Sequence, residues 1–235
     1  LRDRYQVRLT DRRPLQEVIA RGYGHQPPGS PLPLLPAFPH TEMPCDVTDP
    51  DQVMAACDGM DAIINCSVIR YTDHDHAVNT VGCWNIARAA AKNRIRRVVQ
   101  TGPQMTHLDS VVGYHSDYDA PGNAAPRPGR NLYGHTKYLG AEILRMFAHW
   151  HAMEIPVLVF NGFVTQQSRG ENVFETTFEE SADAIVKALE VPALPSPWEL
   201  ITVNNDLPHG RNSSQRAWEV LGWKTSQYLE DTWRD

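Results

Sequence analysis

The chain has 235 residues, which is enough for one α/β domain with a substantial core and too few for two α/β domains of ordinary size. Its 41% hydrophobic and 21% charged residues are typical of a globular protein, and a formal charge of −6 without a basic block argues against nucleic acid as a partner. No apolar stretch is long enough to span a membrane and no signal peptide is visible, so we expect a cytoplasmic protein with four reduced cysteines.

The N-terminal part predicts a strand that ends in an acidic residue. Residues 5–11 alternate in polarity, and Asp11 closes the run immediately before Arg12. At the end of the second strand of a dinucleotide-binding fold, such an Asp accepts hydrogen bonds from the adenosine ribose and selects NAD. A guanidinium at this place could instead receive the 2′-phosphate of NADP. An ordinary strand-to-turn Asp explains the same pattern, so these alternatives stay open.

The glycine-rich turn of a dinucleotide-binding fold does not occur in this sequence. It should precede the strand-end Asp by roughly 20 residues, yet only ten residues stand before Asp11. Either the sequence begins after the first strand and its turn, or the protein lacks a pyrophosphate cradle. We favour a sequence that begins late, because a sheet without its central strand would expose two edges.

A proline-rich segment and a capped helix follow. Residues 22–40 contain six prolines, which exclude a regular helix or a central strand and predict a surface insertion. Beyond it, Asp49 and Pro50 predict the start of a helix that runs through Cys57, with Asp49 as its N-cap.

Residues 61–68 form a short apolar run suited to a strand buried on both faces. The next polar stretch, residues 73–76, alternates Asp and His, which suggests a metal site at first sight. A metal needs ligands that converge from a supported geometry, and neighbouring side chains in a polar loop more often face water. We therefore predict no metal site.

A long amphipathic helix begins near residue 132. Its apolar residues recur at a spacing that predicts one stripe packed against a core, at Leu132, Leu139, Ile143 and Phe147. Tyr133 and Lys137 are four residues apart, so they leave the same face of this helix about one turn from each other. The ammonium favours the phenolate and lowers the tyrosine pKa, which lets the oxygen exchange a proton with an alcohol or a carbonyl. A Tyr and a Lys that face solvent and have no catalytic role could have the same spacing.

The setting of this pair points to a family. The helix follows a buried strand at residues 96–101 and a long polar loop, and Tyr133-x-x-x-Lys137 in that setting resembles the extended short-chain dehydrogenase/reductases, the NAD-dependent epimerase/dehydratase family. Residues 79–87 resemble that family's Asn-x-x-Gly-Thr-x-Asn helix, and the tail around residues 221–223 resembles its uronate-dehydrogenase-like branch. The resemblance implies a Rossmann-like, doubly wound parallel α/β sheet, an NAD or NADP cofactor, and a homodimer.

The resemblance also implies roles for single residues. Tyr133 is the general acid/base, and Lys137 lowers its pKa and holds the nicotinamide ribose. The further cofactor-binding residues that it implies are Asp11 and Arg12 at the adenosine ribose, Asp46 and Val47 at the adenine, Ser67 at a ribose, and Asn79 at the nicotinamide ribose. Gly82 would allow a helix to pack closely against the sheet.

One segment departs from the family pattern at a catalytic position. Pro103 falls where a Ser or Thr hydroxyl should hydrogen-bond the substrate oxygen, and proline cannot donate. Thr101, Gln104, Thr106 or Ser110 could replace that hydroxyl, and Thr106 is our choice. Losing such a donor costs about a hundredfold or more in rate.

The C-terminal part leaves little chain for gripping a large substrate. Residues 155–160 predict a buried strand and residues 178–190 a helix, with only a short polar stretch between them. A free sugar or sugar acid therefore fits better than a nucleotide sugar, and Arg211 could pair with its carboxylate. A surface Arg with no fixed partner is at least as plausible.

Together these observations predict a single NAD(P)-binding Rossmann domain over residues 1–235, in which residues 165–235 contribute a small substrate-binding part. The predicted function is NAD(P)-dependent oxidation or reduction of a free sugar, sugar acid or similar small molecule, through hydride transfer assisted by Tyr133 and Lys137. The alternatives are a sugar epimerase and a catalytically degenerate relative that binds a nucleotide or a partner protein.

Overall fold

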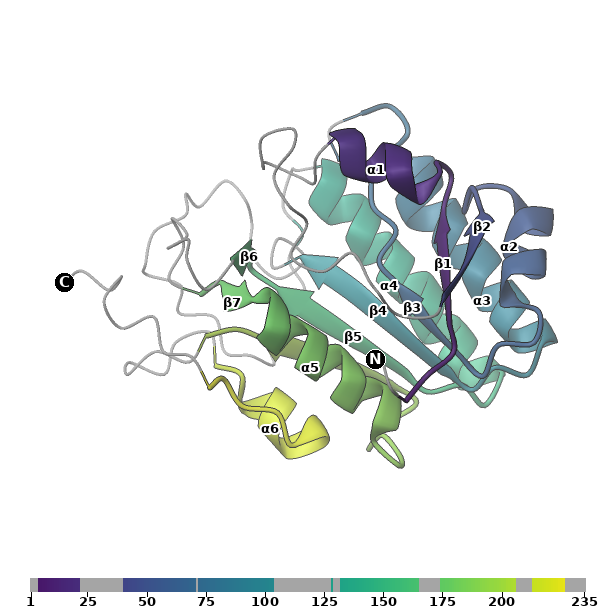
Figure 1. Cartoon of the computed structure of the whole chain (residues 1–235). Coiled ribbons are helices and arrows are strands. Elements are labelled where there is room, and N and C mark those ends of the chain that lie inside the picture. Colours follow the sequence, from purple (N-terminus) through teal and green to yellow (C-terminus); the bar gives the residue numbers. More distant parts are fainter. Residues whose placement is uncertain are drawn as a thin grey trace.

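A four-stranded parallel sheet lies at the centre of the molecule (Figure 1). The structure is a computed structural model, and it describes residues 4–21, 40–70, 72–103, 128, 132–164, 174–205 and 213–226. The strands of the central sheet are, in spatial order, β3 (Ala62–Asn65), β4 (Arg97–Pro103), β5 (Ile155–Phe160) and β8 (Trp198–Val203). All neighbouring pairs are parallel, so the predicted parallel sheet is confirmed.

Two smaller parallel pairs accompany the central sheet. The strand predicted at the N-terminus is β1 (Val7–Asp11), which pairs with β2 (His40–Pro44), and these two form a sheet of their own. Two-residue strands, β6 (Phe163–Val164) and β7 (Thr176–Thr177), form the third sheet. The proline-rich segment lies outside the described residues, apart from the first residue of β2.

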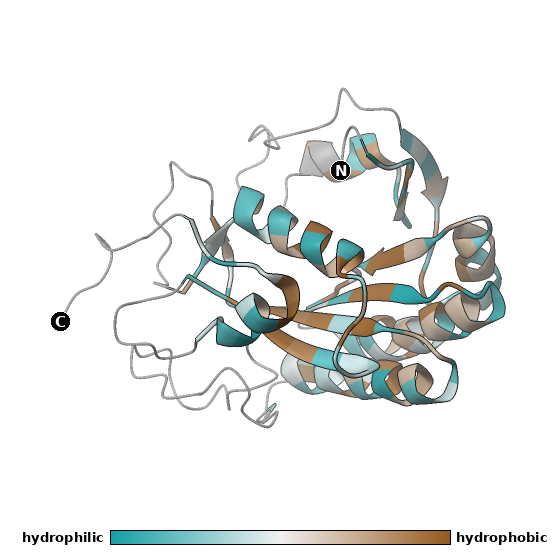
Figure 2. Ribbon diagram, turned by 90° about the horizontal axis from the view of Figure 1, so that it is seen from below, coloured by the Kyte–Doolittle hydropathy of each residue, from teal (hydrophilic) through white to brown (hydrophobic). Residues whose placement is uncertain are grey.

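Helices cover both faces of the central sheet, which is the predicted doubly wound arrangement (Figures 1 and 2). One face carries α2 (Pro50–Cys57), α3 (Gly82–Lys92) and α4 (Leu132–Trp150), and the other carries α5 (Phe178–Glu190) and α6 (Gln215–Leu221). A short helix, α1 (Leu15–Arg21), follows β1, and the π-helix η1 (Ala77–Val81) leads directly into α3.

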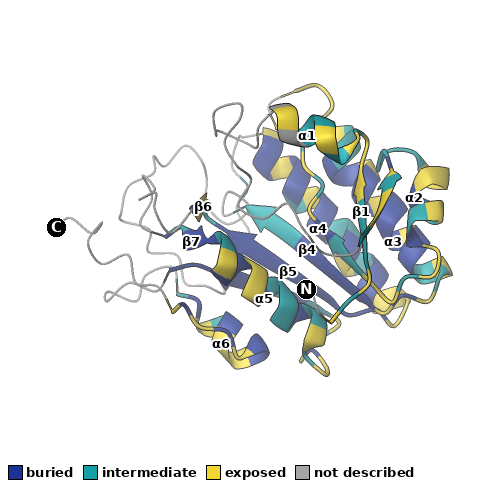
Figure 3. Ribbon diagram, viewed as in Figure 1, coloured by how far each residue is buried: buried dark blue, intermediate teal, exposed yellow. Residues whose placement is uncertain are grey.

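Alternation along the buried strands builds one core on each face (Figure 3). All six residues of β5 are buried, and Val157 and Val159 pack with α3 and α4, whereas Leu158 and Phe160 pack with α5 and α6. This is the two-sided burial expected of a central parallel strand. Packing on both faces holds the central strands in place, and the carboxyl ends of β4 and β5 lead toward the predicted site.

The predicted burial of residues 61–68 on both faces is wrong. In β3, Ala62 is exposed and Ile63 and Ile64 are only half-buried. The reason is that β3 is an edge strand within the described part of the chain, where β4 is its hydrogen-bonded neighbour.

Local signals placed the helix starts correctly. Asp49 caps α2, because its side chain accepts hydrogen bonds from the backbone N–H groups of Asp51 and Gln52. The helix predicted at residues 178–190 is α5, whose N-terminus has a capping box between Thr177 and Glu180.

The predicted apolar stripe of α4 is partly wrong. Phe147 is buried, but Leu132 and Leu139 are 54% and 44% exposed. The buried faces of α4 instead carry small and polar residues together with larger ones, because this helix packs against the sheet on one side and against η1 and α3 on another. Tyr133 and Lys137 belong to these buried faces, each 5% exposed.

Candidate active site

Tyr133 and Lys137 lie in the first turns of α4 and are both buried. The Nζ of Lys137 donates a hydrogen bond of 3.3 Å to the carbonyl oxygen of Ser67, in the segment that follows β3. The predicted pair is therefore attached to the carboxyl end of the central sheet, the edge at which open α/β sheets bind their ligands.

Burial controls the charge state of Lys137. Loss of solvent lowers the pKa of its ammonium group, and the nearby Cys83 and Cys66 oppose this effect only where their thiols are ionised. Burial also raises the pKa of the Cys83 thiol, to about 11, so this thiol is neutral at pH 7. The site thus keeps a lysine whose proton is easier to remove than that of a solvated lysine.

Asn79 lies on the π-helix η1 and is 1% exposed. Its Nδ2 donates to the carbonyl oxygen of Ile69 at 3.2 Å and to Oγ1 of Thr136 at 3.0 Å. Its Oδ1 is buried and accepts no hydrogen bond from the described residues. A buried acceptor without a donor is costly, so this oxygen has an unmet demand for one.

Close packing holds Asn79 against α4. A Cβ on Gly140 would lie 2.2 Å from the carbonyl oxygen of Asn79 and 2.9 Å from Sγ of Cys83, so glycine at this position lets the two helical segments touch. The predicted close approach at Gly82 also exists, since a Cβ there would lie 2.8 Å from a side-chain atom of Val47. Its partner is the segment after β2.

A buried hydrogen-bond network shapes the segment that Lys137 contacts. Asn65 donates to Oε1 of Gln100 at 2.7 Å, and its Oδ1 accepts from the backbone N–H and the hydroxyl of Ser67, at 3.1 and 2.7 Å. Thr101 donates its hydroxyl to the carbonyl oxygen of Asn65 at 3.1 Å. Asn65 and Gln100 have no predicted role, although polar side chains inside apolar strand runs mark both residues in the sequence.

The residues predicted to bind the adenosine end lie at the carboxyl ends of β1 and β2. Asp11 is exposed, and its Oδ1 accepts from the backbone N–H of Arg13 at 2.9 Å. Asp46 accepts from the backbone N–H and hydroxyl of Thr48, which lower the pKa of its carboxyl group, and Arg12 adds to this effect. Val47 is fixed by Asn85, whose Nδ2 donates to the Val47 carbonyl at 2.9 Å.

Arg70 is a site residue that the sequence analysis missed. Its guanidinium carbon lies over the Tyr133 ring, 5.2 Å from the ring centroid. No motif marks this residue, because it stands in a polar segment after β3 with no helical or strand periodicity. Its position beside Tyr133 depends on the contact of α4 with the segment after β3, where Lys137 donates to the Ser67 carbonyl.

Two predicted site residues, Thr106 and Arg211, lie outside the described residues, as do Gln104 and Ser110. Pro103 is the last residue of β4. Thr101, another candidate for the substrate hydroxyl, already donates to the Asn65 carbonyl.

The side chains of residues 73–76, which alternate Asp and His, were predicted to face water, and one of them does not. Asp73, His74 and His76 are exposed, but Asp75 is fully buried and accepts hydrogen bonds from the backbone N–H and the hydroxyl of Thr72. In the described part of the chain, no three His, Cys, Asp or Glu side chains are grouped as metal ligands. The same part contains no helix long and apolar enough to cross a membrane.

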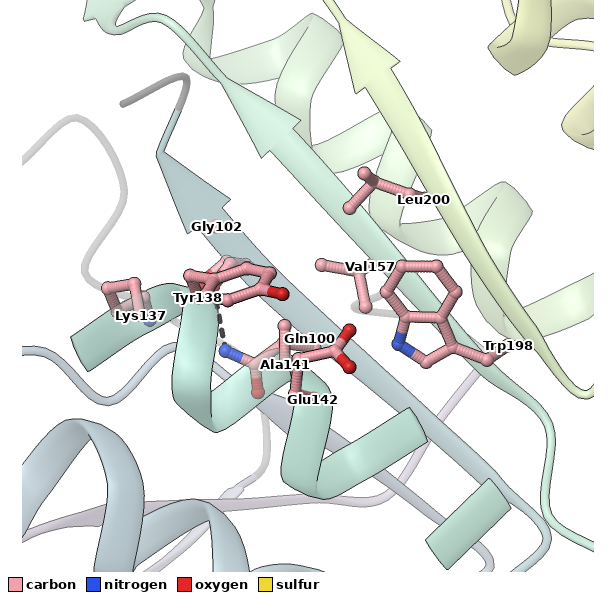
Figure 4. Close-up of a pocket in the computed structure, with 10 residues that line it drawn as sticks. Gln100, Gly102, Lys137, Tyr138, Ala141, Glu142, Val157, Trp198 and Leu200 are labelled. Carbon is pink, nitrogen blue, oxygen red and sulfur yellow. Dashed lines mark hydrogen bonds between the residues drawn. The ribbon is translucent and has the colours of Figure 1, made fainter. Parts of the chain in front are cut away.

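A small pocket lies between α4 and the central sheet, and Lys137 is one of its lining residues (Figure 4). Tyr138, Ala141 and Glu142 of α4 line it together with Trp198 of β8, and the buried indole Nε1 of Trp198 has no hydrogen-bond partner among the described residues. Tyr133 is not part of its lining. We therefore do not assign the chemistry to this pocket.

Comparison with known proteins identifies the family. The model of the NAD dependent epimerase/dehydratase family matches residues 2–174. This chain belongs to that family. The resemblance inferred from the motifs is thereby confirmed.

Relatives within the family include two uronate dehydrogenases. The one from Pseudomonas syringae pv. tomato is 23% identical over 152 residues, covering 63% of this chain and 54% of the relative. The one from Agrobacterium fabrum is 27% identical over 191 residues, covering 79% and 69%. The dTDP-4-dehydrorhamnose reductase of Mycolicibacterium smegmatis is 34% identical over 110 residues, covering 43% and 32%. The chain thus spans about half the length of the Pseudomonas relative and a third of the Mycolicibacterium one.

Solved structures confirm the Rossmann-like fold. The glucuronic acid dehydrogenase from Chromohalobacter salexigens superposes with a TM-score of 0.74 at 18% identity, covering 96% of this chain and 77% of the other. The uronate dehydrogenase from Agrobacterium tumefaciens gives a TM-score of 0.73 at 20% identity, with the same coverage.

Proposed function

We propose that this chain belongs to an NAD-dependent dehydrogenase that oxidises a free sugar acid. The observation that carries the proposal is the buried Tyr133 and Lys137 pair at the carboxyl edge of the sheet, with Lys137 held by the Ser67 carbonyl. Membership of the NAD dependent epimerase/dehydratase family supports the cofactor, and the uronate dehydrogenases among the relatives support the substrate class.

In the proposed reaction, Tyr133 takes the hydroxyl proton of the substrate as its carbon is oxidised. The neighbouring ammonium of Lys137 favours the phenolate that accepts this proton. When bound, NAD supplies the acceptor for the hydride. Because Pro103 has no donor to offer, we propose that Thr106 orients the substrate oxygen.

The chain's own residues fit a dinucleotide. The buried Oδ1 of Asn79 accepts no hydrogen bond from the described residues, and a ribose hydroxyl of the dinucleotide could donate one to it. We propose that Ser67, Asn79, Tyr133 and Lys137 hold the nicotinamide half, that Asp11 and Arg12 bind the adenosine ribose, and that Asp46 and Val47 contact the adenine. The exposed carboxylate of Asp11 favours NAD over NADP, since a 2′-phosphate would meet a like charge.

We propose a single Rossmann domain over residues 1–235, in which residues 165–235 contribute the substrate-binding part. Within that range, β8 extends the central sheet and α5 covers one of its faces. Arg211 remains a proposed contact for the substrate. All four cysteines are unpaired, which suits a reducing compartment, and we propose a cytoplasmic location.

We further propose a homodimer through η1, α3 and α4. Exposed apolar side chains gather on these packed segments, at Val81, Trp84, Leu139 and Trp150. Trp84 and Phe147 contact edge to face, with ring centroids 5.1 Å apart, so α3 and α4 present one joint surface. A second copy would bury this surface and explain why Leu139 faces outward.

A degenerate, nucleotide-binding relative is the second candidate. It is favoured by Pro103, which stands at the position of the usual catalytic hydroxyl, and by Thr101, whose hydroxyl is already used within the protein. Under this proposal the protein binds NAD and leaves sugar acids unchanged.

One experiment separates the two candidates. The full-length protein is mixed with NAD and with D-glucuronate or D-galacturonate, and NADH formation is followed by absorbance, while NAD binding is measured by calorimetry. We expect turnover in the wild type, its loss by at least about a thousandfold in Tyr133→Phe, and little change in Tyr138→Phe, a half-buried tyrosine of the same helix. Binding of NAD without turnover supports the degenerate relative, and unchanged turnover in Tyr133→Phe refutes the role of Tyr133.

A further inference from the structure

Arg70 presents an exposed cation beside the tyrosine of the proposed site. It follows Ser67 by three residues, and its guanidinium carbon lies 5.2 Å from the centroid of the Tyr133 ring. A small molecule with an oxygen at the Tyr133 hydroxyl would therefore also come within reach of this guanidinium.

No carboxylate of the described residues lies within ion-pair distance of Arg70. The groups that act electrostatically on nearby Lys137 are the thiols of Cys83 and Cys66 and Arg70 itself. Arg70 beside Tyr133 and Lys137 one helical turn further along α4 thus have no carboxylate partner among the described residues, which makes this part of the site attractive to an anion.

The position of Arg70 over the Tyr133 ring leaves it able to bind such an anion, because the side chain is exposed. A guanidinium over an aromatic ring uses its flat face for that contact, whereas its N–H donors point outward in the plane of the group. Those donors match the two oxygens of a carboxylate, which accept them as a bidentate pair. The Tyr133 ring therefore contacts Arg70 without using its N–H donors, and these donors have no carboxylate partner among the described residues.

We propose that Arg70 binds the carboxylate of the substrate and thereby selects sugar acids over the corresponding neutral sugars. This inference rests on the proposed function and deepens it, because it assigns the acid selectivity to the segment after β3. It also gives Tyr133 and Arg70 different roles. Tyr133 acts on the reacting hydroxyl, and Arg70 binds the charged end of the same substrate molecule.

The test compares two substrates that differ only at C6, where D-glucuronate carries a carboxylate and D-glucose a neutral hydroxymethyl group. Kinetic constants are measured with NAD for the wild type and for Arg70→Met, Arg70→Lys and Arg211→Met. Arg145→Met serves as the matched control, because Arg145 is an exposed arginine of α4 that pairs with Glu142 of the same helix. Arg70→Met keeps a long side chain and removes the charge.

We expect Arg70→Met to lower kcat/KM for D-glucuronate by about 100-fold, mainly through KM, and to change kcat/KM for D-glucose by less than about threefold. Arg70→Lys should recover only part of the loss, since an ammonium cannot form the bidentate pair. Arg145→Met should behave as the wild type. Equal losses for both substrates in Arg70→Met would overturn the inference, and so would selectivity that depends on Arg211 alone.

A binding measurement separates this inference from the proposed function. Calorimetric titration of D-glucuronate and of D-glucose into the NAD-bound protein needs no turnover. If the wild type binds D-glucuronate in preference to D-glucose and Arg70→Met does not, the inference holds even where no NADH is formed. If the wild type shows no such preference, or Arg70→Met retains it, the inference is wrong, whatever the enzyme turns over.

Discussion

The ammonium of Lys137 donates a hydrogen bond of 3.3 Å to the Ser67 carbonyl oxygen, across 70 residues of sequence. This bond joins the first turns of α4 to the carboxyl end of β3. The ammonium is buried, and the charged or ionisable groups described near it are two thiols and a second cation, Arg70. Burial of this basic group is unfavourable for stability, whereas the proposed reaction needs a cation beside Tyr133.

Lys137→Met should stabilise the protein at pH 7 and abolish turnover. Burial lowers the pKa of Lys137 below its ordinary value of 10.5, so folding removes a basic group from solvent at a cost that the variant lacks. We expect the Tm to rise by about 2–4 °C, the shift that about 1 kcal/mol produces in a chain of this size.

The pH dependence of this effect has a definite sign. Between the lowered folded-state pKa and 10.5, the unfolded chain retains a proton that folded Lys137 has lost, so wild-type stability rises with pH in that window. The Tm advantage of Lys137→Met should therefore shrink as the pH approaches 10. Thermal unfolding at several pH values measures this, and an advantage that grows with pH would contradict it.

Gly140→Ala should weaken both the fold and the binding of NAD. The new methyl group would lie 2.2 Å from the Asn79 carbonyl oxygen, so η1 and α4 must separate. Overpacking of this kind costs about 1–3 kcal/mol, and displacement of Asn79 should raise the Kd for NAD. Gly102→Ala is the stability control, because its nearest contact would be an ordinary 3.7 Å. Normal stability in Gly140→Ala would show that this contact is not tight.

Glu154→Ala should destabilise the protein without a comparable effect on the site. Glu154 pairs with Arg97 at 2.6 Å and with Arg96 at 2.9 Å, and Arg97 also donates to backbone carbonyls at the end of α5. Removing the carboxylate leaves the buried Arg97 unpaired, at a cost of about 3–5 kcal/mol.

Thermal unfolding and steady-state kinetics check this prediction together. Arg96 is 65% exposed, so Arg96→Ala should cost less than about 1 kcal/mol. The cluster lies at the amino ends of β4 and β5, at the opposite end of the sheet from Tyr133. KM values measured below the Tm should therefore stay close to those of the wild type.

Trp84→Glu should convert the proposed dimer into a monomer. The charge would fall in the middle of the apolar surface on α3 and α4, where its desolvation is costly. Light scattering after size-exclusion chromatography gives the molar mass. Trp218→Glu is the control, because Trp218 is similarly exposed but belongs to α6 on the other face of the sheet. A wild-type protein that is monomeric at micromolar concentration would refute the dimer.

Much of the fold was predictable because its signals are local. The strand at residues 155–160 and the helix at residues 178–190 have the predicted bounds. Asp49 caps its helix as expected, since a cap depends only on the next three residues. The helical period likewise placed Tyr133 and Lys137 on one side of a helix before any contact was known.

The tertiary structure decided which groups meet, because packing depends on residues far apart in the chain. The sequence alone could not show that Leu139 faces outward, since the burial of α4 is set by Gly140 against η1 and by the sheet beneath it. It also gave no sign of Arg70, which reaches Tyr133 only once α4 lies against the segment after β3. Periodicity thus determined the helix and the side of it that Tyr133 and Lys137 share, and long-range contacts determined that a guanidinium lies beside Tyr133.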